Sequence, residues 1–258
     1  MKGIKRAALV TLLSISLAVT LTACGSGGGG GGNGGNGSGG GSDTYDVVAN
    51  GIPKFAGVDY IELAKVYRIS KFRSGEGHDY SDNFESCRSM KHYFNPKDSV
   101  DWSTIKIFSP VEGTISKISQ EWAGTQVQIK SKDYPAFYFI IFHINLSNPL
   151  NVGDSVTAGQ QLGTHIGSQT MSDIAVGVNT PSGWKLISYL DVMTDSVFQG
   201  YQARGISSRT DAIISKEARD ADPLYSGPRN LDSVISYTWD TKRGGPSGAN
   251  VQEVSAFI

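Results

Sequence analysis

The side chains of this chain that could do chemistry are few, because it holds four histidines and two cysteines. His78 stands four residues before Asp82 in the segment HDYSD, and His143 ends a long apolar run. Further along, Asp173 and Ala175 are two residues apart, a spacing that puts both on one face of a β-strand. Imidazole and carboxylate groups are common zinc ligands. By spacing alone, however, His78 and Asp82 could also simply hydrogen-bond to each other in a loop.

The elements that must position these residues are short β-rich runs separated by turn residues. No long helical pattern precedes residue 210, and turn chemistry stands at Val152–Asp154 and Ala158–Gln160. This pattern predicts an all-β domain, an antiparallel sandwich or open barrel. The runs that favour strands are Val66–Phe72, Ile105–Phe108, Gly113–Ile118, Gln126–Lys130, Phe137–Ile144, Ile174–Val178 and Trp184–Tyr189.

Four motifs in a fixed order give the chain a family resemblance. HDYSD is followed by SPVEGTI at Ser109–Ile115, by FHI at Phe142–Ile144 and by VGDSVTAGQQLG at Val152–Gly163. Over roughly residues 77–193, this order resembles the lysostaphin/LytM-type zinc metallopeptidases, which cut peptidoglycan cross-bridges. The resemblance implies an antiparallel all-β fold of the LytM type. An insert at Asn83–Ser103 departs from the family pattern.

The resemblance also implies a site, and the chain departs from it at one motif. Zinc in the family is held by the two residues of HxxxD, here His78 and Asp82, and by the second histidine of an HxH motif. His143 matches a strand-end histidine that handles protons. Where the family has HxH, Asp173 replaces the catalytic histidine and Ala175 replaces the third ligand. Both are expected to face the cleft, and since Ala175 offers no donor, tight zinc binding is not expected.

The other histidines and the second cysteine leave alternatives open. His92 lies in the insert and could reach the cleft to complete a cluster with His78 and Asp82. His165 is expected to be a surface histidine. Cys87 is expected to be a buried structural cysteine rather than a reactive thiol.

The start of the chain has the pattern of a bacterial lipoprotein signal. A basic beginning and an apolar stretch, Ala7–Thr20, lead into Leu21–Cys24, which resembles a lipobox. We therefore expect residues 1–23 to be a signal peptide and Cys24 to be lipidated, followed by a flexible glycine-rich tether to residue 42. Gly25 follows the cysteine, which favours a lipid anchor in the outer membrane of the cell envelope.

The remainder is expected to form a LytM-like β domain at residues 43–195 and a polar C-terminal extension at 196–258. The extension is expected to pack on the domain, with a partner-binding appendage as the alternative. Within it, Thr210–Ala221 favours a helix that Ser208 or Thr210 could cap, and Leu231–Trp239 favours a strand. The formal net charge is −1, without basic clusters, so nothing supports nucleic-acid binding.

Three functions follow from this pattern. The first is a lipid-anchored envelope protein that keeps the peptidase fold without hydrolysis and binds peptidoglycan or regulates a cell-wall enzyme. The second is an active zinc endopeptidase with an altered ligand set that draws on Asp173, His143 or His92. The third is a structural or adhesive surface lipoprotein that makes its contacts through the C-terminal extension.

Overall fold

The computed structural model describes residues 42–74, 80–82, 84–85, 89–221 and 251–253. Gly39–Ile258 form one compact unit, to which all of these residues belong. His78, Cys24, Cys87 and the predicted strand Leu231–Trp239 lie outside the described residues. No helix within the described ranges is long and apolar enough to cross a membrane.

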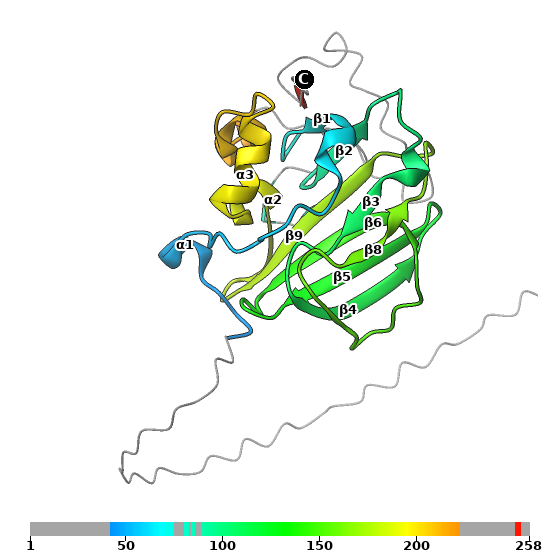
Figure 1. Ribbon diagram of the computed structural model, residues 1–258. Coiled ribbons are helices and arrows are strands. Elements are labelled where there is room, and N and C mark those ends of the chain that lie inside the picture. Colours follow the sequence, from blue (N-terminus) through cyan, green and yellow to red (C-terminus); the bar gives the residue numbers. More distant parts are fainter. Residues whose placement is uncertain (1–41, 75–79, 83, 86–88, 222–250, 254–258) are drawn as a thin grey trace, which may run out of the picture. The chain divides into compact units, whose positions relative to one another are not determined.

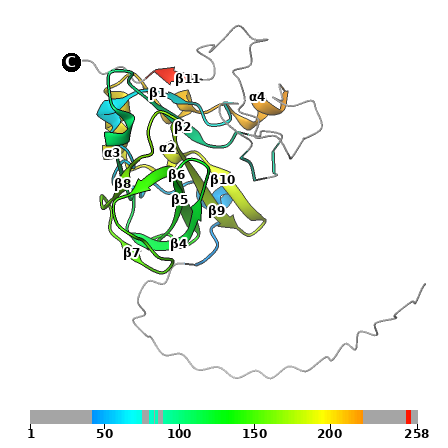
Figure 2. The ribbon, with the colours of Figure 1, turned by 90° about the vertical axis from the view of Figure 1, so that its right-hand side faces the viewer.

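The described strands join into a single antiparallel sheet (Figure 1). Its central order is β11-β1-β2-β9-β6-β5-β4-β7, while β10 pairs with β9, and β8 pairs with both β6 and β3. Figure 2 looks nearly along the strands and shows the sheet curving through β4, β5 and β6. The strands are β1 (Val66–Ser70), β2 (His92–Pro96), β3 (Lys106–Phe108), β4 (Gly113–Gln120), β5 (Thr125–Ser131), β6 (Phe137–Leu146), β7 (Ser155–Val156), β8 (Gln161–His165), β9 (Ser172–Thr180), β10 (Gly183–Ile187) and β11 (Val251–Glu253).

The predicted fold class, an open antiparallel β structure, is confirmed, and each run predicted to be a strand within the described residues overlaps one. The reason is visible in the burial patterns. In β5, every second residue is buried, as expected for a strand with one face on the core. The VGDSVTAGQQLG motif forms β7, a turn and β8, with Gly153 and Gly159 at positive φ of 97° and 78°.

Strand β2 was not predicted, because it lies inside the insert Asn83–Ser103. It enters the sheet between β1 and β9 and pairs antiparallel with both. His92 lies opposite Ile174, Tyr93 opposite Asp173, and Phe94 opposite Ser172. The insert is therefore part of the sheet rather than only a surface loop.

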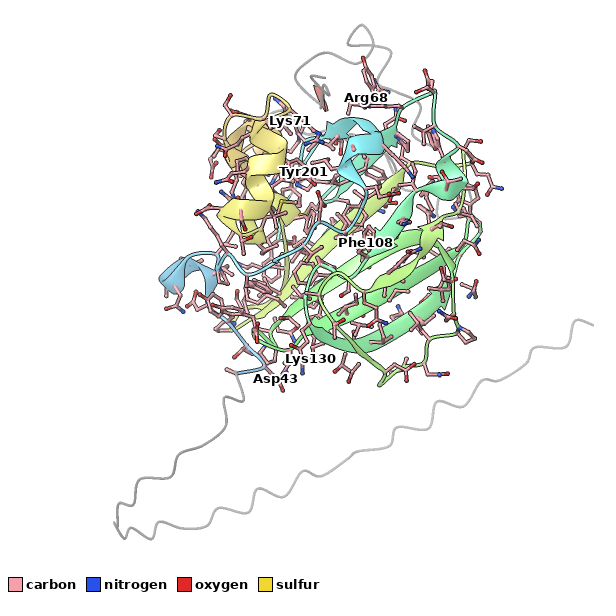
Figure 3. The ribbon with its side chains drawn as sticks, in the orientation of Figure 1. Asp43, Arg68, Lys71, Phe108, Lys130 and Tyr201 are labelled. Carbon is pink, nitrogen blue, oxygen red and sulfur yellow. The ribbon has the colours of Figure 1, made fainter. Side chains whose placement is uncertain are left out.

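The described helices are short, and those after residue 188 gather at one end of the sheet (Figure 1). The α-helices are α1 (Val47–Asn50), α2 (Tyr189–Val192), α3 (Asp195–Gln202) and α4 (Lys216–Ala221), and the 3-10 helices are η1 (Leu63–Lys65), η2 (Trp102–Thr104) and η3 (Arg209–Ala212). Helix α3 was not predicted. It packs into the main core through Phe198 and Tyr201, the latter labelled in Figure 3.

The single helix predicted at Thr210–Ala221 is wrong, because the chain extends between η3 and α4. Ile213 has φ −132° and forms a parallel bridge with Phe72. The amide of Phe72 also donates to the carbonyl of Ala212, and the amide of Ile214 donates to the carbonyl of Phe72. This pairing with a distant segment replaces the helical hydrogen bonds. At the start of η3, Ser208 and Asp211 form a capping box, as the sequence suggested for Ser208.

The two central strands, β6 and β9, are buried on both faces. On one face, Phe139 and Ile141 of β6 join the main core. On the other, Ile140 and Phe142 form a smaller apolar cluster with Ala175 of β9. The remaining buried members of this second cluster are Phe72, Met90 and Leu186. The sheet face that carries Ala175 is therefore covered by other parts of the chain.

Candidate functional site

His143 lies in a β-bulge of strand β6. Opposite β5, Ile144 pairs with Thr125 and Ile141 pairs with Val127, so two residues of β6 face the single residue between those partners. His143 takes up the extra length with a positive φ of 60°, which is uncommon for a residue other than glycine. Because of the bulge, Phe142 and His143 both turn to the face that carries Asp173.

Asp173 of β9 is fully buried and forms an ion pair with Lys91. The ammonium of Lys91 donates to Oδ2 of Asp173, and neither side chain is exposed to solvent. Tyr93 lies opposite Asp173 in the sheet register, and Lys91 stands two residues before Tyr93. The start of β2 therefore brings Lys91 to this face.

His143 contacts the second oxygen of the same carboxylate. Its Nε2 lies 3.2 Å from Oδ1 of Asp173, and its Nδ1 donates to the carbonyl of Ala123 at 2.8 Å. A carboxylate oxygen of Glu121 lies 3.8 Å from Nδ1. Since acceptors flank both ring nitrogens, the surroundings favour a doubly protonated imidazole.

The pKa values follow from these contacts. Burial alone would raise the pKa of Asp173, but the charge of Lys91 and the contact with His143 outweigh it and lower that pKa to about 2. Burial lowers the pKa of Lys91, and Asp173 opposes this shift. Burial alone would also lower the pKa of His143, but Asp173 and the Ala123 carbonyl outweigh it, so that pKa is raised. Burial, together with the charge of Asp173, raises the pKa of Glu121 against the opposing charge of His143.

Aromatic rings surround the ammonium of Lys91. Nζ lies 3.8 Å from the ring centre of Phe142, 4.9 Å from that of Tyr80 and 5.0 Å from that of Tyr93. Such contacts stabilise a cation through the quadrupoles of the rings, more strongly where water is excluded. Lys91 and Asp173 therefore form an ammonium–carboxylate pair that is closed off from solvent.

Asp173 and Ala175 share one face of β9, as predicted, but that face is not an open cleft. Asp173 is 0% exposed and Ala175 is 1% exposed. Ala175 packs in the second apolar cluster beside Phe142, and Lys91 lies over the Phe142 ring. Side chains of the protein thus fill the space in front of these residues.

Asp82, predicted as a metal ligand, is 8% exposed, and both of its carboxylate oxygens accept hydrogen bonds from backbone amides. Oδ1 accepts from Phe84 and Oδ2 accepts from Leu186 in β10, each at 2.9 Å. Asp82 therefore ties its loop to the edge of the sheet. Its proposed partner, His78, lies outside the described residues, so the pair itself stays a prediction.

His92 is a structural histidine on the other face of the sheet. Its Nδ1 donates to the carbonyl of Ser70 at 2.9 Å, and its Nε2 lies 2.8 Å from the hydroxyl of Ser188. Burial lowers the pKa of His92 to about 4, so the ring is neutral near pH 7. His92 pairs with Ile174, whose side chain lies in the main core, so it points away from Asp173.

The expectation that His165 is a surface residue is wrong, because its exposure is 0%. It ends β8 opposite Ile144 of β6, and its Nδ1 accepts a hydrogen bond from the amide of Gly167. Burial lowers the pKa of His165 to about 4, so it is also neutral near pH 7. The polarity of histidine suggested exposure, but β8 lies between β6 and β3, and the Trp102 ring packs 6.1 Å from the His165 ring.

The donor set does not fit the zinc site that the resemblance implies. No group of three histidine, cysteine, aspartate or glutamate side chains within the described ranges could hold a metal. Oδ2 of Asp173 is engaged by Lys91, both oxygens of Asp82 are engaged by amides, and Ala175 offers no donor. The ammonium of Lys91 therefore occupies one of the two oxygens with which Asp173 could bind a cation.

The motif order predicted His143 and Asp173 as site residues, and the structure brings them together, but no motif marks Lys91 or Glu121. Lys91 could have been suspected from alternation, since it stands two residues before Tyr93 in the run MKHYF. That signal is weak without the pairing of β2 with β9. Glu121 belongs to the turn between β4 and β5, and its position beside His143 depends on the bulge.

Several solved structures are similar to part of this chain. The catalytic domain of the antimicrobial peptidase lysostaphin from Staphylococcus simulans is 18% identical, with a TM-score of 0.30 over 48% of this chain and 90% of that domain. Csd3 from Helicobacter pylori is 15% identical, with a TM-score of 0.39 over 58% of this chain and 40% of its own. The SpoIIQ–SpoIIIAH pore-forming complex is 13% identical, with a TM-score of 0.38 over 57% of this chain and 96% of the matched one.

The chain is thus similar in fold to LytM/lysostaphin-type peptidase domains, the group that its motifs predicted. It spans less than half of two further members, 43% of a LytM-type protein from Ruminococcus gnavus and 39% of lysostaphin in solution. No protein-family model matches the chain, and no curated protein is significantly similar to it. At these TM-scores the likeness does not decide what the chain does, which has to be argued from its own residues.

Proposed function

We propose that this chain is a lipid-anchored cell-envelope protein that uses a LytM-type fold without hydrolysis, to bind peptidoglycan or to regulate a cell-wall enzyme. The observation that carries the proposal is the buried ion pair between Lys91 and Asp173. It closes the face of β9 on which the resemblance places the cleft, and Ala175, at the position of the third zinc ligand, offers no donor beside it. Hydrolysis through zinc-bound water requires such an open coordination position.

The test for hydrolysis uses the fragment Gly39–Ile258, which retains the whole described core. We expect this fragment to leave cross-linked murein intact in the presence of added zinc, measured as the absence of new amino termini. A lysostaphin-type peptidase on the same murein serves as the positive control. Release of new peptide ends by the fragment, abolished by Asp173→Ala, would refute the non-hydrolytic proposal.

The choice between peptidoglycan and a protein partner needs a separate measurement. Sedimentation of the fragment with purified sacculi is expected if peptidoglycan is the ligand. If the fragment stays in the supernatant but increases the activity of an added murein amidase, a regulatory role is favoured. Absence of both effects would contradict either form of the proposal.

Anchoring is tested on the full chain. We expect Cys24→Ser to abolish incorporation of a labelled fatty acid and to move the protein from the membrane fraction to the soluble fraction. Outer and inner membranes separated on a density gradient then test the predicted outer-membrane location. Unchanged labelling of the serine variant would exclude Cys24 as the lipidated residue.

A further inference from the structure

The carboxylate of Asp173 requires a cation wherever it is buried. An ion removed from water without a partner costs several kcal/mol even after relaxation of the protein. In a zinc enzyme, the metal supplies the positive charge of the site. In this chain, Lys91 supplies it from within the polypeptide.

The surroundings of this positive charge suit an ammonium rather than a metal. The rings of Phe142, Tyr80 and Tyr93 lie within 5.0 Å of Nζ. Aromatic faces attract an organic cation, whereas zinc requires nitrogen, oxygen or sulfur donors. The insert that departs from the family pattern provides Lys91 and Tyr93 through β2, and so it provides both the cation and part of its enclosure.

His143 retains an arrangement that metal-binding histidines use. Nδ1 donates to a backbone carbonyl, and Nε2 lies 3.2 Å from Oδ1 of Asp173. In metal sites, a hydrogen bond of this kind on the far nitrogen orients the ligating nitrogen. A metal that displaced the proton of Nε2 would find two adjacent ligands, His143 and the carboxylate of Asp173, with an ammonium bound to the carboxylate.

We propose that the ammonium of Lys91 takes the place of a metal cation at this site and excludes divalent metal by occupying Asp173. The missing ligand at Ala175 is then not the sole reason why the site binds no metal. The inference deepens the proposed non-hydrolytic function by naming what blocks the site. Metal binding tests this inference, whereas murein cleavage tests the proposed function. A failure of the inference can therefore be distinguished from a failure of the proposed function.

The experiment compares zinc binding by the wild-type fragment Gly39–Ile258 and by its Lys91→Glu variant, using equilibrium dialysis and thermal unfolding. The substitution removes the ammonium and adds a carboxylate near Asp173 and His143, which gives three donors. We expect the variant to bind about one zinc per chain, and its melting temperature to rise with zinc concentration, while the wild type shows neither effect. The matched control, Lys91→Glu with Asp173→Asn, is expected to lose at least about tenfold in zinc affinity.

Two results would overturn the inference. One is stoichiometric zinc binding by the wild-type fragment that Asp173→Asn abolishes. The other is a folded Lys91→Glu variant that binds zinc no better than its Asp173→Asn control. If Lys91→Glu folds only with zinc, that rescue supports the inference. If Lys91→Glu does not fold at all, the test uses Lys91→Gln instead. The inference then requires Lys91→Gln to bind zinc at least about tenfold more tightly than the wild type. Equal zinc binding by Lys91→Gln and the wild type would refute it.

Discussion

The ion pair between Lys91 and Asp173 should also contribute to stability, and Lys91→Met measures how much. Methionine is one atom shorter than lysine and is an unbranched apolar side chain that suits the ring-lined site, but it removes the ammonium that lies over the Phe142 ring. Both partners are 0% exposed, and removing one partner of a buried pair costs about 3–5 kcal/mol, because the other charge stays buried. We therefore expect Lys91→Met to lower the free energy of unfolding by an amount in this range.

His143 makes this loss depend on pH. When its imidazole is protonated, it attracts Asp173 across 3.2 Å with about 5 kcal/mol at an effective dielectric constant of about 20. The pKa of His143 is raised above its ordinary value, so the ring is charged at pH 5.5 and loses its proton as the pH rises. The destabilisation caused by Lys91→Met should therefore be smaller at acidic pH and grow with increasing pH.

The assay is urea unfolding of the fragment Gly39–Ile258, followed by tryptophan fluorescence at several pH values. Asp173→Asn added to Lys91→Met removes the stranded carboxylate, so the double variant should be more stable than Lys91→Met alone. A loss below about 1 kcal/mol that does not change with pH would refute the reasoning, because such a value is typical of a solvated ion pair. A double variant less stable than the single one would also contradict it.

Three further predictions follow from single positions. The pKa of His92 is lowered from 6.5 to about 4, so unfolding takes up a proton and the free energy of unfolding should fall as the pH drops from 6.5 to 4. His92→Gln should weaken this pH dependence in urea titrations at about pH 4–7. An unchanged pH dependence would contradict the prediction. Gly177→Ala should destabilise by about 1–3 kcal/mol, since a Cβ there would lie 1.9 Å from the Trp184 ring, and an unchanged melting temperature would argue against this packing. His143→Val should be less stable than His143→Asn by about 1–2 kcal/mol, because asparagine tolerates the positive φ of this position and valine does not. Equal urea midpoints for the two variants would argue against a positive φ at position 143.

Much of the sheet could be predicted from local patterns. Strand β5 alternates buried and partly exposed residues, and β6 is a continuous apolar run, so both stand out in the sequence. Glycine-marked turns delimit β7 and β8 in the same way. Strand β2 escaped notice because it ends in proline and lies in an insert that departs from the family pattern.

The candidate site was predictable only in part. The motif order suggested that His143 and Asp173 lie near each other, and the pairing of β6 with β9 brings them together. The partner of Asp173 could not be found in this way, since Lys91 lies 82 residues away in the sequence and reaches it only through the pairing of β2 with β9. Nor does the sequence mark the bulge, because no glycine or asparagine stands at its positive φ.

The sequence by itself determined the all-β class, the turns and the absence of a ligand at Ala175, because these depend on residue type and short-range periodicity. Tertiary structure alone decided that the face of Asp173 is closed, that His165 is buried and that the predicted helix breaks at Ile213. The physical reason is the same in each case. Burial, ion pairing and bridging to Phe72 depend on segments that are far apart in the chain and meet only once the sheet has formed.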